Sequence, residues 1–244
     1  MASILDRYGI KEVADVTFYK IQPDGSIGAP VLYLDTLKVS TIEQTAENTS
    51  ARGGKGNPEL ITWDYGKEIT VTLEDALFSA KSMAIMFGSV DTDGGAVIGS
   101  SASILKTARK ADVTDGKVTI HGESITIPTE GTSYYNADGT TGTSTSYDYV
   151  TFPLSVKDVS VIDISPETFP GTYYITGDTY ARREVDGLDE FFQFIIPKAK
   201  VQSEVTLTME AEGDPSTFSM NLRVLRPTND SMMKLVKYNL ELTR

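Results

Sequence analysis

Few stretches of this chain combine residue types that could do chemistry. The run Gly53-Gly54-Lys55-Gly56 invites comparison with a phosphate-binding loop, in which glycine amides surround the phosphates and a lysine neutralises them. That motif requires Ser or Thr directly after the lysine to reach the magnesium ion, and here Gly56 follows Lys55. A flexible basic loop is therefore the better interpretation.

A second candidate is a cation site at Asp91-Thr92-Asp93-Gly94-Gly95, where alternate carboxylates precede a glycine turn as in a calcium loop. The full calcium motif closes with a bidentate glutamate at its twelfth position, which counted from Asp91 is Ala102. Turn formation explains these residues better than metal binding does. We expect no metal site and no cofactor.

Acid–base chemistry has little support. His121 is the only histidine, so neither a catalytic triad nor a two-histidine metal site can form within one chain. The acidic residues Asp186, Asp189 and Glu190 could in principle act as a glycosidase pair, but solvated turn residues show the same spacing. The sequence predicts that the protein is not an enzyme.

Composition limits the other function classes. The chain has 34 acidic and 22 basic residues and a formal charge of −12, so it lacks the basic footprint of a nucleic-acid-binding protein. It has no cysteine, which excludes thiol chemistry and thiolate zinc sites. The segment from Met1 to Glu12 lacks the apolar run of a secretory signal, and no stretch is long enough to span a membrane. We expect a soluble cytoplasmic product.

The clearest structural pattern runs from Glu204 to Arg226 and predicts a long β-hairpin. Apolar residues alternate with polar ones on both sides of a turn at Gly213–Ser216, so one face belongs to the core and the other is polar. The apolar positions are Val205, Leu207, Met209, Ala211, Phe218, Met220, Leu222 and Val224. The remaining segments are expected to extend this sheet, cover it or leave it as loops.

The N-terminal part predicts a hairpin from Val13 to Ile42, followed by a polar loop from Glu43 to Glu59. Because a loop of this length is unusual, we expect it to become ordered only against another molecule. A strand resumes around Trp63, and a helix is predicted from a cap at Thr72 to a stop at Gly88.

From Ser89 to about Arg183 the chain changes to short β-prone pieces separated by Gly, Ser, Thr and Asp. This predicts a core domain of residues 1–88 and 184–244 with an inserted β-rich elaboration, residues 89–183. Phe191–Ile196 is expected to return to the core as a central strand, and Met232–Leu240 to supply a final strand.

The order of these segments resembles the tail tube, or major tail, proteins of long-tailed bacteriophages. The resemblance covers the first third and the last fifth of the chain. It is carried by the polar loop 43–59, the strand Ile61–Glu68, the helical segment Leu73–Ser79, and the closing runs Phe191–Lys200, Glu210–Phe218 and Met233–Val236.

This resemblance implies a mainly β (α+β) fold: two packed antiparallel sheets forming a sandwich or barrel, flanked by one α-helix, with the insertion added. It implies a structural virion protein of the tail, made in the bacterial host cytoplasm, whose copies form rings, usually hexameric, that stack into a hollow tube. DNA would pass through the lumen without specific binding. The other partners would be tail proteins: the tape measure, the baseplate or tip, and the terminator. No catalysis and no membrane are implied.

Three sets of residues are candidates for these contacts. The loop expected between stacked rings contains Glu43, Glu47, Arg52, Gly53, Gly54, Lys55 and Asn57. An N-terminal arm would bind a neighbour through Ile4, Leu5 and Tyr8. The polar hairpin face, with Thr206, Thr208, Glu210, Glu212 and Asn221, would line the lumen, where negative charge repels DNA.

Two alternatives stay open. Another virion role, such as a head decoration protein or a tail completion ring, would produce oligomers that do not elongate. A carbohydrate-binding module is favoured only by acidic pairs and by the tyrosine pairs Tyr134-Tyr135 and Tyr173-Tyr174. The residues do not specify the host, the ring symmetry or whether the tail contracts.

Overall fold

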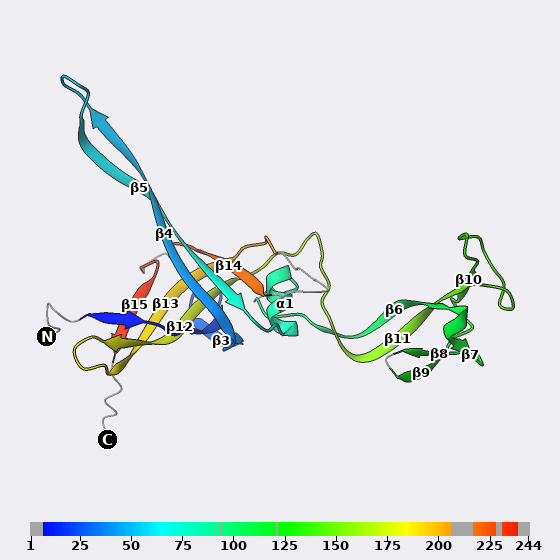
Figure 1. Cartoon of the computed structure of the whole chain (residues 1–244). Helices are drawn as coiled ribbons and strands as arrows, with labels where there is room; N and C mark the ends of the chain where they lie inside the picture. Colours follow the sequence, from blue (N-terminus) through cyan, green and yellow to red (C-terminus); the bar gives the residue numbers. More distant parts are fainter. Residues whose placement is uncertain (1–6, 93, 121, 206–216, 228–230, 239–244) are drawn as a thin grey trace. The chain divides into compact units, whose positions relative to one another are not determined.

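The computed structural model describes residues 7–92, 94–120, 122–205, 217–227 and 231–238, and it divides the chain into two compact units (Figure 1). The larger unit combines residues 1–98 and 162–244, and the smaller one is Gly99–Val161. The smaller unit is shorter than the expected insertion of residues 89–183. The difference arises because strand β12 (Thr172–Arg183) pairs within the main sheet instead of belonging to the insertion.

The larger unit is built on a nine-stranded antiparallel sheet with the order β3-β2-β12-β13-β14-β5-β4, to which β1 adds beside β12 and β15 beside β13. Its other strands are β1 (Tyr8–Ile10), β2 (Asp15–Ile21), β3 (Ile27–Leu34), β4 (Leu37–Arg52), β5 (Glu59–Asp75), β13 (Asp189–Val201), β14 (Phe218–Val224) and β15 (Lys234–Tyr238).

One hydrophobic core lies on the inner face of this sheet. Alternate residues of β2, β5, β12, β13 and β14 are buried, as a sheet with one dry face requires. Phe18 and Tyr173 meet edge to face, with ring centroids 5.7 Å apart. Gly177 is needed for packing, because a Cβ at this position would lie 2.0 Å from the ring of Phe194.

The helix is shorter than predicted and begins later. Helix α1 spans Ala80–Phe87, with Ser79 as its N-cap in a capping box with Ser82. The predicted start at Thr72 is wrong because residues 69–75 keep the two-residue period of a strand, with Leu73 in the core of β5. The predicted stop is confirmed, since Gly88 adopts the left-handed conformation of a C-cap.

The C-terminal strands follow the sequence pattern where the structure describes them. Phe218, Met220, Leu222 and Val224 are buried on β14, as the alternation predicted. The strand predicted at Phe191–Ile196 is confirmed within β13, and the final strand is β15. Residues 206–216, most of the first arm of the predicted hairpin and its turn, lie outside the described residues.

The smaller unit contains two three-stranded antiparallel sheets, β10-β11-β6 and β7-β8-β9, around a small core of Val118, Val150 and Phe152. Its elements are β6 (Gly99–Arg109), a 3-10 turn η1 (Lys110–Asp112), β7 (Val113–Thr114), β8 (Lys117–Ile120), β9 (Glu123–Thr126), β10 (Ser133–Tyr135) and β11 (Tyr149–Val161). The predicted mainly β class, with packed antiparallel sheets and one α-helix among the described residues, is confirmed. The architecture is sandwich-like and not a closed barrel.

Candidate functional site

The most unusual surface of the larger unit is the hairpin formed by β4 and β5, which extends away from the sheet (Figure 1). Its inner half belongs to the core, where Ile69, Val71 and Leu73 of β5 are buried. In its outer half, residues 43–49 and 59–68 are all exposed. A two-stranded ribbon with both faces in solvent has marginal stability by itself. We call residues 43–68 the outer hairpin.

The expectation of an irregular loop from Glu43 to Glu59 is wrong. Glu43 and Glu47 lie in β4, which continues to Arg52, and only residues 53–58 form the turn. The pattern missed this strand because both faces are exposed, so no apolar alternation marks it. Thr45 and Thr49, whose β-branched side chains favour extended backbone, were the available signal.

The outer hairpin has one apolar face. Ile61, Trp63 and Tyr65 are 54%, 52% and 52% exposed, and they pair across the ribbon with Ala51, Thr49 and Glu47. Directly paired residues share a face, so the three apolar side chains stand in one row. More than half of each residue's surface remains open to solvent.

A bulge at Gly66 places the apolar row on the face of the hairpin opposite to the buried residues of its inner half. Ile69 pairs with Gln44, whereas Tyr65 pairs with Glu47, so β5 holds one residue more than β4 between these pairs. Gln44 and Glu47 are three residues apart and therefore point to opposite faces of β4. It follows that Tyr65 and Ile69 also lie on opposite faces, although their spacing alone predicts the same face. Gly66 permits the bulge because its φ is +63°, a left-handed value that favours glycine.

The turn of the hairpin is held by its own backbone. The Gly53 amide donates to the Pro58 carbonyl at 3.2 Å, and the Asn57 amide donates to the Gly54 carbonyl at 3.1 Å. Arg52 and Glu59 form an ion pair across the strand ends at 3.1 Å. Lys55 at the tip is exposed. This turn joins two strands, whereas a phosphate-binding loop joins a strand to a helix.

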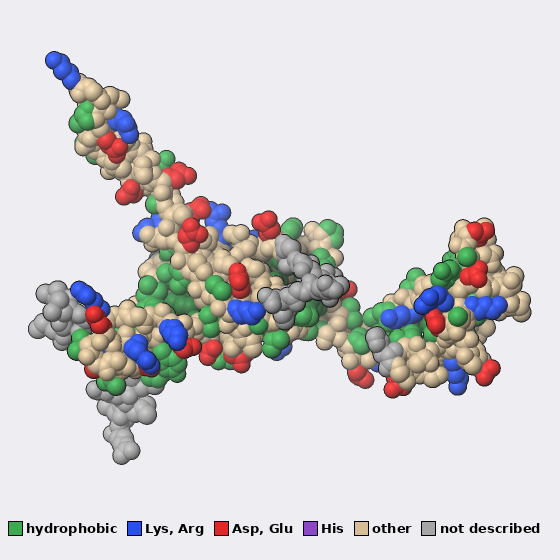
Figure 2. Space-filling model, in the orientation of Figure 1, with side chains coloured by type: hydrophobic (Ala, Val, Ile, Leu, Met, Phe, Trp, Pro, Cys, Tyr) green, Lys and Arg blue, Asp and Glu red, His purple; other side chains and the backbone are tan. Residues whose placement is uncertain are grey.

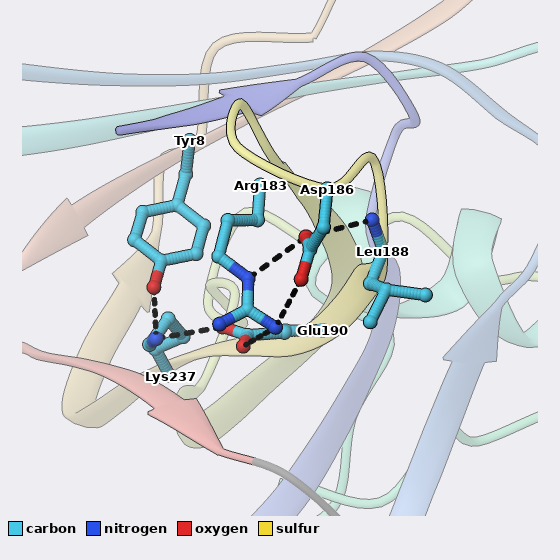
Figure 3. Close-up of polar contacts among 6 residues, drawn as sticks. All are labelled: Tyr8, Arg183, Asp186, Leu188, Glu190 and Lys237. Carbon is cyan, nitrogen blue, oxygen red and sulfur yellow. Dashed lines mark hydrogen bonds and ion pairs between the residues drawn. The ribbon is translucent and has the colours of Figure 1, made fainter. Parts of the chain in front are cut away.

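The described N-terminal strand is tied to the C-terminal strand of the same chain (Figure 3). Lys237 of β15 donates to Glu190 at 2.6 Å and to the Tyr8 hydroxyl at 2.5 Å. The hydrogen bond to Glu190, followed by the one to Tyr8, raises the pKa of Lys237 above its usual value. Glu190 is only 4% exposed, and Arg183 lies 3.6 Å from its other oxygen. Tyr8 therefore contacts its own chain, while Ile4 and Leu5 lie outside the described residues.

A family model described as the YomU/Tube protein family matches residues 8–237. The chain belongs to this family. The match spans both units, including the smaller one that the sequence pattern set apart as an elaboration. A comparison with curated proteins found no match.

In this member of the YomU/Tube family, part of the predicted lumen face can be located. Asn221 of β14 lies on the face opposite the core and accepts a hydrogen bond from the Thr72 hydroxyl at 3.1 Å. Arg223 on the same face pairs with Glu68. This face is polar, as predicted. Thr206, Thr208, Glu210 and Glu212 lie outside the described residues.

The remaining chemical candidates of this YomU/Tube family chain have structural explanations. Asp91 accepts from the Gly95 amide at 2.6 Å and lies 3.6 Å from Lys20, so it closes a turn. Asp186 and Asp189 pair with Arg183 and Arg182. Across the described ranges, no three His, Asp or Glu side chains gather closely enough to hold a metal ion. His121 lies outside those ranges.

Among the residues that the structure describes, no helix has the length and hydrophobicity of a membrane span.

Proposed function

We propose that this protein is a structural protomer of a bacteriophage tail tube, whose copies assemble into rings that stack around a hollow lumen. The observation that carries the proposal is the outer hairpin, a two-stranded ribbon on which Ile61, Trp63 and Tyr65 are each more than half exposed. Membership of the YomU/Tube family supports the same assignment. The working object would then be the polymer, localised in the virion tail, with no catalytic role.

The outer hairpin is the proposed contact between copies in successive rings. Burial of Ile61, Trp63 and Tyr65 against a neighbour would supply the hydrophobic free energy that the isolated ribbon lacks. Hexameric rings and contacts with the tape measure, the baseplate or tip, and the terminator are parts of the same proposal.

Shortening the hairpin tests this function. Residues 48–64 would be replaced by Asn-Gly, a two-residue turn suited to joining the paired residues Glu47 and Tyr65. The wild type should form long hollow rods in negative-stain microscopy, and the shortened protein should stay folded by circular dichroism without forming rods. Leu105→Ser, on an exposed residue of the smaller unit, is the control and should assemble normally.

The outcomes separate the alternatives. Discrete rings from the wild type at every concentration would favour a tail completion ring or a decoration protein. Rods from the shortened protein would refute the role of the hairpin. Wild type that stays monomeric, even beside its tail initiator complex, would refute the tube.

The polar face that contains Asn221 is the proposed lumen surface. The formal charge of −12 supports it, because a negatively charged lumen repels DNA and keeps transit free of binding. Glu210→Lys with Glu212→Lys should leave tubes intact and slow genome delivery. Delivery at the wild-type rate from intact tubes would contradict this assignment.

Carbohydrate binding by the smaller unit is a second candidate function. Tyr135, Tyr149 and Arg109 pair in one row across three strands, and the two rings are 38% and 40% exposed. Exposed aromatic rings beside hydrogen-bond donors suit the apolar and hydroxyl faces of sugars. Wild type that binds a glycan array, with binding lost in Tyr135→Ala and Tyr149→Ala, would support this candidate. Absence of binding would remove it.

A further inference from the structure

The tip of the outer hairpin is basic in a strongly acidic chain. Residues 48–58 contain Arg52 and Lys55 and no acidic residue, whereas the whole chain carries a formal charge of −12 (Figure 2). Arg52 is neutralised by Glu59. Lys55 forms no ion pair with any residue of the described ranges. The hairpin therefore ends in one unpaired positive charge.

The turn presents this charge without neighbouring side chains. Lys55 stands between Gly54 and Gly56, whose φ values of +84° and +86° are left-handed, and a Cβ at either glycine would meet nothing within 4 Å. The ten steps along β4 from Ile42 to Arg52 span about 33 Å at the usual rise of a strand. Lys55 thus lies far from the part of β5 that pairs with β14, at a position where it could meet another molecule.

A groove of about 530 Å³ in the same unit has the opposite charge. Asp15 of β2 and Asp178 of β12 are directly paired across the sheet. Asp35 comes one residue after Leu34, which pairs with Val16, so it stands on the other side of Asp15. Three carboxylates therefore lie side by side, Asp15 and Asp178 on paired strands and Asp35 directly after the end of β3. We call them the aspartate row.

Such a row is unfavourable within one chain, because like charges directly opposite in a sheet repel. Asp15 accepts a hydrogen bond from the Tyr33 hydroxyl at 3.3 Å, and Asp178 accepts one from Gln193 at 2.8 Å. Neither bond supplies a positive charge. The Asp15 charge, and to a smaller extent those of Asp35 and Asp178, raises the pKa of Tyr33 above its usual value.

The cations that line the groove do not neutralise the row. Arg182 is engaged by Asp189 through two hydrogen bonds of 2.7 Å. Lys11 lines the groove together with Glu12 and forms no ion pair with the described residues. The exposed side chains of Val13 and Tyr180 add apolar surface for the backbone of an incoming turn.

We propose that Lys55 at the hairpin tip of one copy docks into the aspartate row of a second copy. The inference rests on the proposed tube function and adds the acceptor site for the hairpin. A glycine turn brings the ammonium group close to the carboxylates, and their mutual repulsion falls when it binds. Opposite charges would also set the register between copies, since electrostatic complementarity contributes orientation and rate of association.

A charge exchange tests the docking. Lys55→Glu and, separately, Asp35→Lys should each raise the critical concentration for rod formation by about tenfold and lower its sensitivity to salt. The double variant should recover most of the loss, because the pair is restored with its charges reversed. Lys117→Glu and Glu123→Lys make the same charge changes on exposed residues of the smaller unit and should assemble as the wild type does.

The outcomes distinguish this inference from the tube itself. Rods from both single variants at the wild-type critical concentration would overturn the docking and leave the tube proposal standing. Single variants that fail without recovery in the double variant, while circular dichroism shows all of them folded, would also overturn it. Recovery in the double variant would establish that the two sites meet.

Discussion

The inner and outer halves of the β4–β5 hairpin share two strands but differ in what stabilises them. In the inner half, Val71 and Leu73 are 1% exposed and belong to the core, on the strand that pairs with β14. In the outer half, Trp63 and Tyr65 are 52% exposed and pair across the ribbon with Thr49 and Glu47. The same pair of strands thus passes from the core of the protein into solvent, with the bulge at Gly66 between the two halves.

Because of this difference, we expect the inner half to contribute to folding and the outer half to assembly. Burial stabilises the inner half, so substitutions there should act on the free energy of unfolding. The outer half buries little, so substitutions there should act mainly on contacts between molecules. Variants in each half test this distinction.

The largest effect on stability is expected in the inner half. Leu73→Ala removes a buried side chain and leaves a cavity in the core, which should lower the free energy of unfolding by about 2–5 kcal/mol in urea titrations. Leu60→Ala, on a residue 63% exposed in the outer half, should change it by less than about 0.5 kcal/mol. Similar losses from both variants would show that the outer half is packed after all.

A smaller loss of unfolding free energy is expected where the strands β1 and β15 near the chain ends are joined by side-chain contacts. Glu190→Gln removes the buried carboxylate that accepts from Lys237 and faces Arg183. Both cations keep some solvent contact, so the cost should be roughly 2 kcal/mol, below that of a fully buried pair. Amide exchange of β15 should rise at the same time. Glu184→Gln, in an exposed pair 3.8 Å from Arg7, is the control and should have almost no effect.

The C-terminal strands could be predicted from the pattern of apolar residues, and the fold class followed from the resemblance of the segment order to a known family. Phe218 to Val224 shows the two-residue period of a strand buried on one face, and Phe191 to Ile196 forms a dense apolar run. The outer strand from Glu43 to Arg52 could not be predicted, since a ribbon with two exposed faces shows no regular alternation of apolar and polar residues. The helix start was missed because Leu73 and Ala76 fit a helical stripe as well as a strand.

The candidate sites were less predictable than the fold. Lys55 and Arg52 were predicted to lie in a flexible basic loop, because glycine-rich basic runs are visible in any sequence, but the short turn between two strands was not predicted. The aspartate row was not recognised. Asp15, Asp35 and Asp178 are far apart along the chain, and only the register of β2 with β12 and β3 brings them together. The bulge at Gly66 similarly reverses a face that spacing alone assigns incorrectly.

A residue at the boundary between the halves should have an intermediate effect. Gly66→Ala places a Cβ at φ +63°, which costs about 1 kcal/mol, and it should also disturb the face on which Trp63 stands. Gly53→Ala is the matched control, because its backbone is not left-handed and its nearest contact is an ordinary 3.5 Å to Leu60. Assembly should weaken for Gly66→Ala only. Equal assembly of both variants would show that the bulge does not set the contact face.

The smallest effect on stability is expected for Trp63→Ser. This variant should also separate the effect on assembly from the effect on folding most clearly. The ring is half exposed and pairs only with Thr49, so the free energy of unfolding should fall by less than about 1 kcal/mol. Rod formation should nevertheless be lost, because the ring stands in the centre of the apolar row.

Trp63 is also the only tryptophan, so its emission reports directly on the outer hairpin. In the wild type the emission should shift to shorter wavelength when rods form, as the ring leaves water for a neighbouring molecule. Unchanged emission in fully formed rods would mean that the apolar face stays in solvent. The charged tip would then be the part of the hairpin that joins one copy to the next.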